Sequence, residues 1–402
     1  MANLDKLFDS FSSNSLFVNK QVLQANYAPD TIPHRDELIN QVASILAPCL
    51  RGEKTSNLFV YGKTGSGKTL SVQYVMNELI RKAGESENGV PLKIEYLNCK
   101  LKKVSDTEYR ILAELIKKFG GSVPSTGLPT DQVYSKFIEL IDNKKQLFII
   151  VLDEIDQAVK KTENTFLYNL TRLNSELSKS QISIVGISND LTFLDNIDPR
   201  IKSSLSEEEI VFPPYNALQL QDILKERAEK AFRTDVLEEG VISKCAAFAA
   251  REHGDARRAL DLLRVAGELA ERDASKRVEL RHIDLANGKI EKDKILDVIE
   301  TEPKQFQLVL MSIIQLLESK KVDKLFTGDI YNLYQELCKK TKIEVLTQRR
   351  VGDIISEFDM LGIINAQVIS KGRHGRTREI RLAIPNQIMD RVKEILRDSL
   401  VL

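Results

Sequence analysis

A glycine-rich segment at residues 62–69 carries the strongest chemical signal in the chain. It fits the pattern G-x-x-x-x-G-K-[ST] and lies between an expected strand at residues 57–61 and an expected helix at residues 70–79. Such a phosphate-binding loop (P-loop) wraps its backbone N–H groups around a phosphate, and the helix N-terminus adds partial positive charge. A glycine-rich turn without a ligand is the alternative. The predicted nucleotide-binding residues here are Gly62, Lys63, Thr64, Gly65, Ser66, Gly67, Lys68 and Thr69.

Within this loop, two side chains have separate predicted roles toward ATP or ADP. Lys68 is expected on the β- and γ-phosphates, and Thr69 is expected to bind Mg²⁺. Two acids follow a later apolar run at residues 147–152. At the carboxyl end of a neighbouring parallel strand, Asp153 is predicted to hold Mg²⁺ and Glu154 to orient or polarise the attacking water. Asp156 is interpreted as a helix-start residue.

Asn189 ends another apolar run, at residues 183–188. An asparagine in this position can simply form a turn. If its strand lies between the other two, however, the amide would reach the γ-phosphate or its water. Asn189 is therefore predicted to be catalytic only on that strand order.

Arg257 and Arg258 lie in the first turn of an expected helix that Asp255 caps. A cation at this end interacts unfavourably with the helix dipole, which costs roughly a few tenths of a kcal/mol in stability unless an anion is close. We expect a nucleotide phosphate to be that anion; a solvent-exposed arginine is the alternative. Arg257 is thus predicted as a catalytic and nucleotide-binding residue, and Tyr215 as a nucleotide-binding residue.

A second group of cations lies near the C-terminus. Thr347 can cap a helix with apolar residues at i, i+3, i+4 and i+7, and two β-like runs joined by a basic loop follow. This layout is typical of a winged helix, whose second helix enters the DNA major groove while the hairpin, or wing, contacts phosphate or the minor groove. A solubilising hairpin or a protein-interaction module is the alternative. The predicted DNA-binding residues are Gln348, Arg349, Arg350, Lys371, Arg373, His374, Arg376 and Arg378.

The elements that must position these residues form several domains, since 402 residues exceed the size of one core. Up to residue 188, short β-rich runs alternate with helical patterns, which predicts a parallel sheet. After Phe212-Pro213-Pro214 the strand signals stop and helical patterns continue to about residue 271. We predict an N-terminal arm at 1–25, an α/β base at 26–214, an all-α lid at 215–294 and a winged-helix domain at 295–402.

Composition excludes several classes of protein. Lys+Arg and Asp+Glu both number 58, so any nucleic-acid binding must come from a local patch. No apolar run approaches the ~20 residues of a membrane-spanning helix, and no secretory signal core is present, so no membrane partner is expected. The four widely spaced cysteines predict buried thiols. A cytoplasmic, nucleoid-associated protein is the resulting expectation.

The order of these parts resembles the archaeal origin-recognition and cell-division-control initiators of the AAA+ superfamily over nearly the whole chain. The resemblance rests on Tyr27-Ala28-Pro29, residues 32–36, the P-loop, Asp153-Glu154, Asn189, residues 198–205, residues 254–257 and the winged helix. It implies an AAA+ P-loop parallel-sheet domain with ATP bound between base and lid. It also implies a DNA-touching helical insertion, placed at about residues 101–121. Residues implied to lie near the adenine are Ile32, Pro33, His34 and Arg35.

The function that this resemblance implies is an ATP-switched initiator with slow ATP hydrolysis. Its implied partners are double-stranded origin DNA, paralogous initiators and the replicative helicase. Some relatives carry a second arginine where this chain has Ser204, which leaves Arg200 as the candidate trans-acting arginine finger.

Three other functions compete with this prediction. A clamp loader would end in a helical collar, against which the basic hairpin argues. A signalling ATPase or transcription regulator would typically carry ligand-sensing repeats, which are absent. A DNA-binding protein with an inactive nucleotide site is disfavoured because Lys68, Thr69, Asp153 and Glu154 are all present.

Overall fold

The chain divides into two compact units, residues 1–283 and 284–402. The division falls within one long helix, and the predicted four-part domain boundaries remain a prediction. The computed structural model describes residues 15–85, 90–100, 107–124, 127–162, 165–205, 207–320, 322, 324–370 and 376–400.

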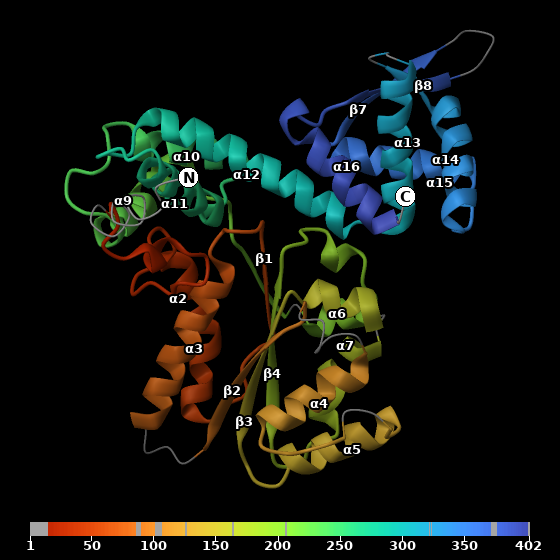
Figure 1. Ribbon diagram of the computed structural model, residues 1–402. Helices are drawn as coiled ribbons and strands as arrows, with labels where there is room; N and C mark the ends of the chain where they lie inside the picture. Colours follow the sequence, from red (N-terminus) through yellow and green to blue (C-terminus); the bar gives the residue numbers. More distant parts are fainter. Residues whose placement is uncertain are drawn as a thin grey trace. The chain divides into compact units, whose positions relative to one another are not determined.

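The base of the first unit is a parallel sheet with strand order β2-β3-β4-β1-β5 (Figure 1). Every residue of β3 is buried, because helices cover both faces of the sheet, and its sequence is accordingly apolar up to Asp153. β4 lies between β3 and β1, which is the order that Asn189 requires. The carboxyl ends of these three strands therefore meet at one edge of the sheet. The strands are β1 (Leu58–Tyr61), β2 (Leu92–Asn98), β3 (Leu147–Asp153), β4 (Gln181–Ser188) and β5 (Glu208–Val211).

Helices cover the two faces of this sheet (Figure 1). On one face, α2 (Asp36–Leu46) and α3 (Lys68–Glu85) bury side chains such as Val72, Val75 and Leu79 against β1, β3 and β4. The other face packs against a core rich in phenylalanine. The helices on that side are α4 (Glu108–Lys118), α5 (Thr130–Ile141), α6 (Ile155–Thr162), α7 (Thr165–Arg172) and α8 (Pro199–Leu205).

Four short 3₁₀ helices connect these described elements. They are η1 (Lys20–Leu23), η2 (Ala47–Arg51), η3 (Leu173–Ser175) and η4 (Phe193–Asp195).

The lid consists of α9 (Ala217–Ala231), α10 (Val241–Arg251) and α11 (Ala256–Arg272). Asn216 starts α9 with a capping box, two residues after Pro214. Residues 15–23 pack onto this lid: the Phe17 ring stacks on Phe232 with centroids 4.6 Å apart, and the Leu16 N–H donates to Glu271 Oε1 at 2.8 Å. The N-terminal segment thus completes the core of the lid.

The second unit has the arrangement of a winged helix. The predicted stripe on α15 (Val351, Ile354, Ile355 and Phe358) is buried, and Thr347 caps that helix as predicted. The small sheet has the order β6-β8-β7, with β7 and β8 antiparallel. Its elements are α12 (Leu280–Thr301), which crosses the unit boundary, α13 (Lys304–Lys320), β6 (Leu325–Phe326), α14 (Thr327–Thr341), α15 (Gln348–Met360), β7 (Ile364–Ser370), β8 (Arg376–Leu382) and α16 (Asn386–Leu400).

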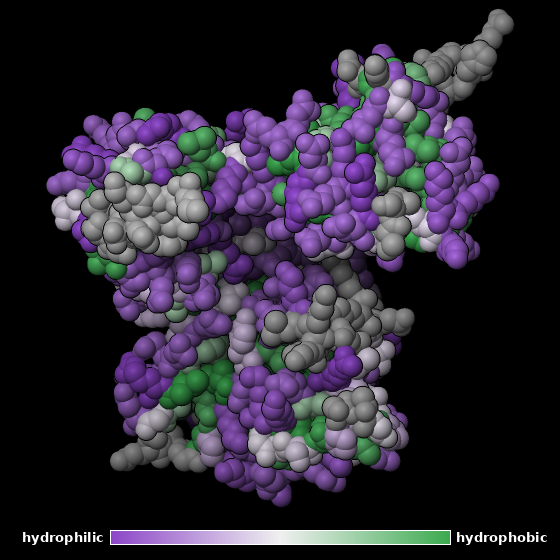
Figure 2. Space-filling view, viewed as in Figure 1, coloured by the Kyte–Doolittle hydropathy of each residue, from purple (hydrophilic) through white to green (hydrophobic). Residues whose placement is uncertain are grey.

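The visible face in Figure 2 is largely hydrophilic over both units, in keeping with a sequence of which 29% is charged. All four cysteines are buried, which confirms that prediction. Among the described residues, no helix combines the length and apolar character needed to cross a membrane.

Candidate functional site

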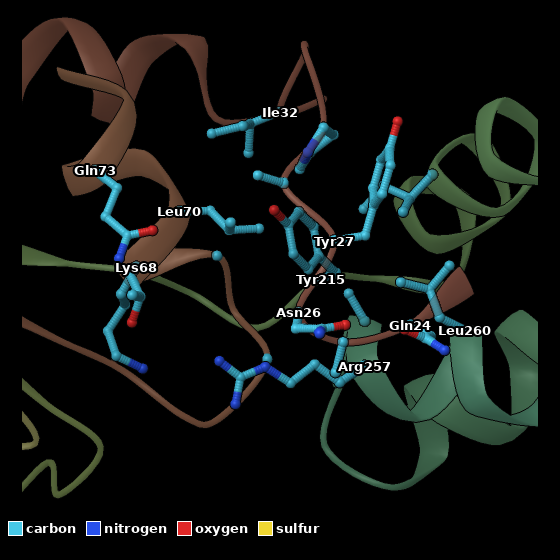
Figure 3. A pocket seen from close by; sticks show the side chains of 18 of the residues that line it. Gln24, Asn26, Tyr27, Ile32, Lys68, Leu70, Gln73, Tyr215, Arg257 and Leu260 are labelled. Carbon is cyan, nitrogen blue, oxygen red and sulfur yellow. The ribbon is translucent and has the colours of Figure 1, made fainter. Parts of the chain in front are cut away.

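A cavity of about 360 Å³ in the first unit lies between the edge of the sheet, the lid and the segment before α2. One end is polar. There Lys68 from the base and Arg257 from the lid reach toward the same side of the cavity (Figure 3). The other end is lined by less polar side chains, among them Tyr27, Ile32 and Leu260. Predicted residues that line the cavity are Ile32, Pro33, Gly65, Gly67, Lys68, Thr69, Asp153, Glu154, Asn189, Tyr215 and Arg257.

Lys68 begins α3 and is 4% exposed. Its ammonium donates to the carbonyl oxygens of Gly62 (2.7 Å) and Lys63 (2.9 Å) and to Oδ1 of Asn189 (2.9 Å). Burial lowers the pKa of Lys68 to about 8, although the nearby Asp153 carboxylate opposes this shift. The strand order therefore brings together Lys68 and Asn189, two residues that were each predicted at the γ-phosphate.

Asp153 ends β3 and accepts three hydrogen bonds. The donors are the Thr69 hydroxyl (3.0 Å), the Tyr96 hydroxyl (2.5 Å) and the Glu154 backbone N–H (2.9 Å). Glu154 has φ = 54°, a left-handed conformation that costs energy for a residue with a side chain. Its carboxylate lies 3.6 Å from the Lys100 ammonium. The two predicted Mg²⁺ ligands, Thr69 and Asp153, are thus in direct contact.

The lid touches the P-loop at the start of α11. Asp255 caps α11 by accepting from the Arg257 and Arg258 N–H groups at 2.8 and 3.3 Å, as predicted. A Cβ at Gly65, whose φ is +71°, would stand 1.8 Å from Asp255 Oδ1, so glycine is needed for this approach. The Arg257 side chain is exposed, and its guanidinium has no hydrogen-bond or ion-pair partner within the described part of the chain.

Six predicted nucleotide-binding residues do not line the cavity: His34, Arg35, Gly62, Lys63, Thr64 and Ser66. His34 turns toward the lid, where Nε2 lies 3.0 Å from Asp222 Oδ2. Arg35 is buried behind the P-loop, with its guanidinium 3.8 Å from the ring centroid of Tyr215. Their predicted place beside the adenine therefore stays a prediction.

Several cavity residues were not predicted, and Tyr96 is the most informative of them. It lines the cavity and contacts Asp153, a role that was not assigned to it. Tyr96 and Asn98 are two positions apart on β2, so their side chains point to the same face of the sheet. Asn98 pairs in register with Asp153, which puts Tyr96 within reach of that carboxylate. Gln73 and Glu226 also line the cavity, but they belong to no sequence motif, and their positions depend on how the helices pack.

These residues fit a nucleotide with Mg²⁺. Gly65 and Gly67 have positive φ values and form a cradle that a Cβ would fill, since a Cβ at Gly67 would stand 2.7 Å from the Tyr215 hydroxyl. Two cations, Lys68 and Arg257, face the polar end, as a phosphate requires. Hydroxyl and carboxylate oxygens are the ligands that Mg²⁺ prefers.

Arg200 lies outside this cavity. Its guanidinium donates to both carboxylate oxygens of Asp198, at 3.1 and 2.8 Å, and lies over the Tyr168 ring. Its side chain is 69% exposed. The Arg200 guanidinium is therefore paired with Asp198 of the same chain.

The winged-helix unit presents a second candidate site on α15. Gln348, Arg349 and Arg350 are exposed in its first turn, where there is no acidic residue. Arg378 instead donates from NH1 to the Gly352 carbonyl (2.7 Å) and the Ser356 hydroxyl (2.6 Å), which ties β8 to α15.

The other predicted wing residues are less fully described. Lys371, Arg373 and His374 lie outside the described residues. Arg376 begins β8 opposite Ser370.

A parallel sheet with a P-loop, strand-end carboxylates and a helical lid defines the AAA ATPase class, and the second unit adds a winged helix. Three family matches agree: an AAA ATPase domain at residues 31–185, a Cdc6 AAA+ ATPase-type lid domain at 221–288, and a CDC6 C-terminal winged helix domain at 297–392. These matches confirm the predicted fold class.

The chain belongs to the family of ORC1-type DNA replication proteins. It is 52% identical to the member from Pyrococcus abyssi over 387 residues, which cover 95% of this chain and 91% of the relative. The member from Thermococcus onnurineus is 52% identical over 399 residues, covering 98% and 94%. The solved structure of the Aeropyrum pernix ORC1 protein in complex with DNA is 45% identical, with a TM-score of 0.82 and coverage of 95% and 97%. These findings confirm the resemblance and favour an initiator over a clamp loader or a signalling ATPase.

Proposed function

We propose that this protein is an ATP-switched replication initiator that binds double-stranded origin DNA through its winged helix and helps to recruit the replicative helicase. The observation that carries the proposal is the first turn of α15, where Gln348, Arg349 and Arg350 are exposed. Arg350 lies 3.8 Å from Asp353 of the next turn, whereas the Arg349 guanidinium has no acidic partner among the described residues. A helix dipole disfavours cations at this end, so an anion such as DNA phosphate would relieve the cost. The Aeropyrum pernix relative, which is bound to DNA, supports this assignment.

In the first unit, we propose that Lys68 and Arg257 bind the phosphates and that Thr69 and Asp153 hold Mg²⁺. A bound Mg²⁺ supplies positive charge that favours cleavage of the terminal phosphate. Glu154 would accept a hydrogen bond from the attacking water, and Asn189 would fix the water's position. In support of this role, Asn189 lines the cavity and its Oδ1 accepts a hydrogen bond from the Lys68 ammonium at 2.9 Å.

We further propose that hydrolysis is slow in the isolated chain. Arg200, the candidate arginine finger, is paired with Asp198 of its own chain. Where an arginine from a neighbouring subunit does reach the site, it raises the hydrolysis rate by roughly 10³–10⁵-fold, and the isolated chain lacks such a neighbour. The protein would then hold ATP or ADP for long periods as a monomer, and paralogues or the helicase aligned on DNA would change its state. A place on the nucleoid in the cytoplasm follows from this proposal.

Genome-wide footprinting of bound DNA tests the function. We expect protection concentrated at replication origins and stronger for the wild type than for the Lys68→Ala variant. Uniform coverage of the genome, or an unchanged pattern in an Arg349→Ala/Arg350→Ala variant, would refute specific origin recognition through α15. A stable ATP-dependent ring without DNA, with turnover lost in Arg200→Ala, would instead indicate clamp-loader-like assembly.

A further inference from the structure

Arg35 is a buried cation between the P-loop and the start of the lid. It precedes α2 and is 3% exposed. Its Nε donates to the Ser66 carbonyl oxygen at 2.8 Å, and its terminal nitrogens donate to the Pro213 carbonyl at 2.5 Å and the His34 carbonyl at 3.3 Å. Its guanidinium also stacks on the Tyr215 ring, 3.8 Å from the centroid. One side chain thus joins the P-loop to the connection that leads into α9.

The charge of this guanidinium lacks a carboxylate partner. Arg35 donates three hydrogen bonds to backbone carbonyls, its other polar contact is with the Tyr215 side chain, and no acidic side chain in the described part of the chain forms an ion pair with it. Burial accordingly lowers the pKa of Arg35. A buried cation held only by dipoles is costly, so an anion close by would be favourable.

The geometry of one peptide links Arg35 to the cavity. The peptide bond between Ser66 and Gly67 is trans, so its carbonyl and N–H groups point in opposite directions. Because the Ser66 oxygen faces Arg35, the Gly67 N–H is turned away from Arg35. Gly67 lines the cavity, and its N–H has no acceptor among the described residues.

We propose that Arg35 is a positioning residue for the nucleotide phosphates: it fixes the Ser66–Gly67 peptide with its N–H toward the cavity and ties this peptide to Pro213 at the base of the lid. The inference rests on the proposed nucleotide site and adds to it a residue that acts through the backbone. The guanidinium polarises the peptide from behind, which strengthens the N–H as a donor to an anion. The same side chain links P-loop occupancy to the lid connection.

The test measures binding of ADP and adenosine to the full-length protein by competition with a fluorescent nucleotide. Arg35→Gln removes the positive charge and the planar guanidinium with its several N–H donors. Arg35→Lys keeps the positive charge but lacks the planar group that stacks on Tyr215. Arg264→Lys is the matched control, since Arg264 is a partly buried lid arginine that pairs with Asp261 and Glu268 away from the cavity. Thermal unfolding without nucleotide identifies any variant that fails to fold, and Arg35→Lys then carries the comparison.

We expect Arg35→Gln to weaken ADP binding by roughly 10- to 100-fold, the range for losing a hydrogen bond that involves a charge. Adenosine, which lacks phosphates, should bind with unchanged affinity, and Arg35→Lys should recover part of the loss. A purely structural role would lower both affinities together. Wild-type ADP affinity in Arg35→Gln, or an equal loss for adenosine, would overturn the proposal.

Amide exchange tests the link to the lid. In the wild type, ADP should slow exchange of the Tyr215 N–H, which is bonded to the Gly254 carbonyl at 3.3 Å. Arg35→Lys with saturating ADP should lose most of this slowing; its retention would refute the coupling. Lys68→Ala separates the two hypotheses, because unchanged ADP affinity in that variant would refute the nucleotide site itself, whatever Arg35 does.

Discussion

Nucleotide binding should take up a proton through Lys68. Burial holds the pKa of this ammonium at about 8 in the protein, whereas an unfolded chain restores the ordinary 10.5. Between these values the unfolded chain binds more protons than the folded one, so this group makes stability rise with pH across that window. A phosphate beside Lys68 favours the charged form and would raise its pKa again.

The expected size follows from the free protein. With a pKa of about 8, Lys68 is about half protonated at pH 8, so binding should take up about 0.5 proton, against about 0.1 at pH 7 and about 0.9 at pH 9. ADP binding is measured by calorimetry in buffers that differ in ionisation enthalpy. The slope of the observed enthalpy against that of the buffer gives the proton count.

The Lys68→Arg variant is the control, since an arginine stays protonated throughout this range and should show no such rise. Calorimetry on wild type without added Mg²⁺ separates this uptake from effects of the metal. A proton count that stays near zero from pH 7 to 9 in wild type would refute the assigned burial and charge state of Lys68.

The remaining predictions concern turnover and DNA. Glu154→Gln should keep ATP affinity and lose turnover by on the order of 10²-fold, as measured by phosphate release; unchanged turnover would remove Glu154 from the reaction. Arg373→Ala with Arg376→Ala should weaken binding to all DNA sequences and flatten its salt dependence by roughly 0.9 log-log units for each phosphate that the variant no longer neutralises, and an unchanged slope in salt titrations would assign the wing to protein binding. Arg349→Ala should change the preference among DNA sequences by about 1–3 kcal/mol in competition binding, unlike the wing variant; a uniform loss would contradict base contact.

The sequence predicted the parts of the site that lie at the ends of strands and helices. The P-loop, Asp153, the Asp255 cap and the Thr347 cap each have a local signature, because one residue type satisfies a specific backbone group or conformation. Asn189 needed the strand order, which the sequence left open and the sheet supplies. Its contact with Lys68 joins residues 121 positions apart.

Other features depended on tertiary packing and had weak local signals. The placement of Arg35 beside the adenine stays a prediction, and no sequence pattern indicated that its side chain would contact the backbone carbonyls of Ser66 and Pro213. Helix α16 was not predicted, although Ile388, Val392, Leu396 and Leu400 recur every four residues. The docking of residues 15–23 on the lid also went unpredicted, because its partners lie more than 200 positions away.

That docked segment has a consequence for synthesis on the ribosome. Leu16 and Glu271 are 255 positions apart, and at about 5–20 residues per second the ribosome needs on the order of 10–50 s to join them. During that interval Phe17, Val22 and Leu23, which are buried in the finished protein, have no lid to pack against. The nascent chain therefore carries an apolar N-terminal segment that chaperones can bind. A nucleotide cavity lined by residues 24–29 and 31–33 and by the lid can form only after α11 has emerged.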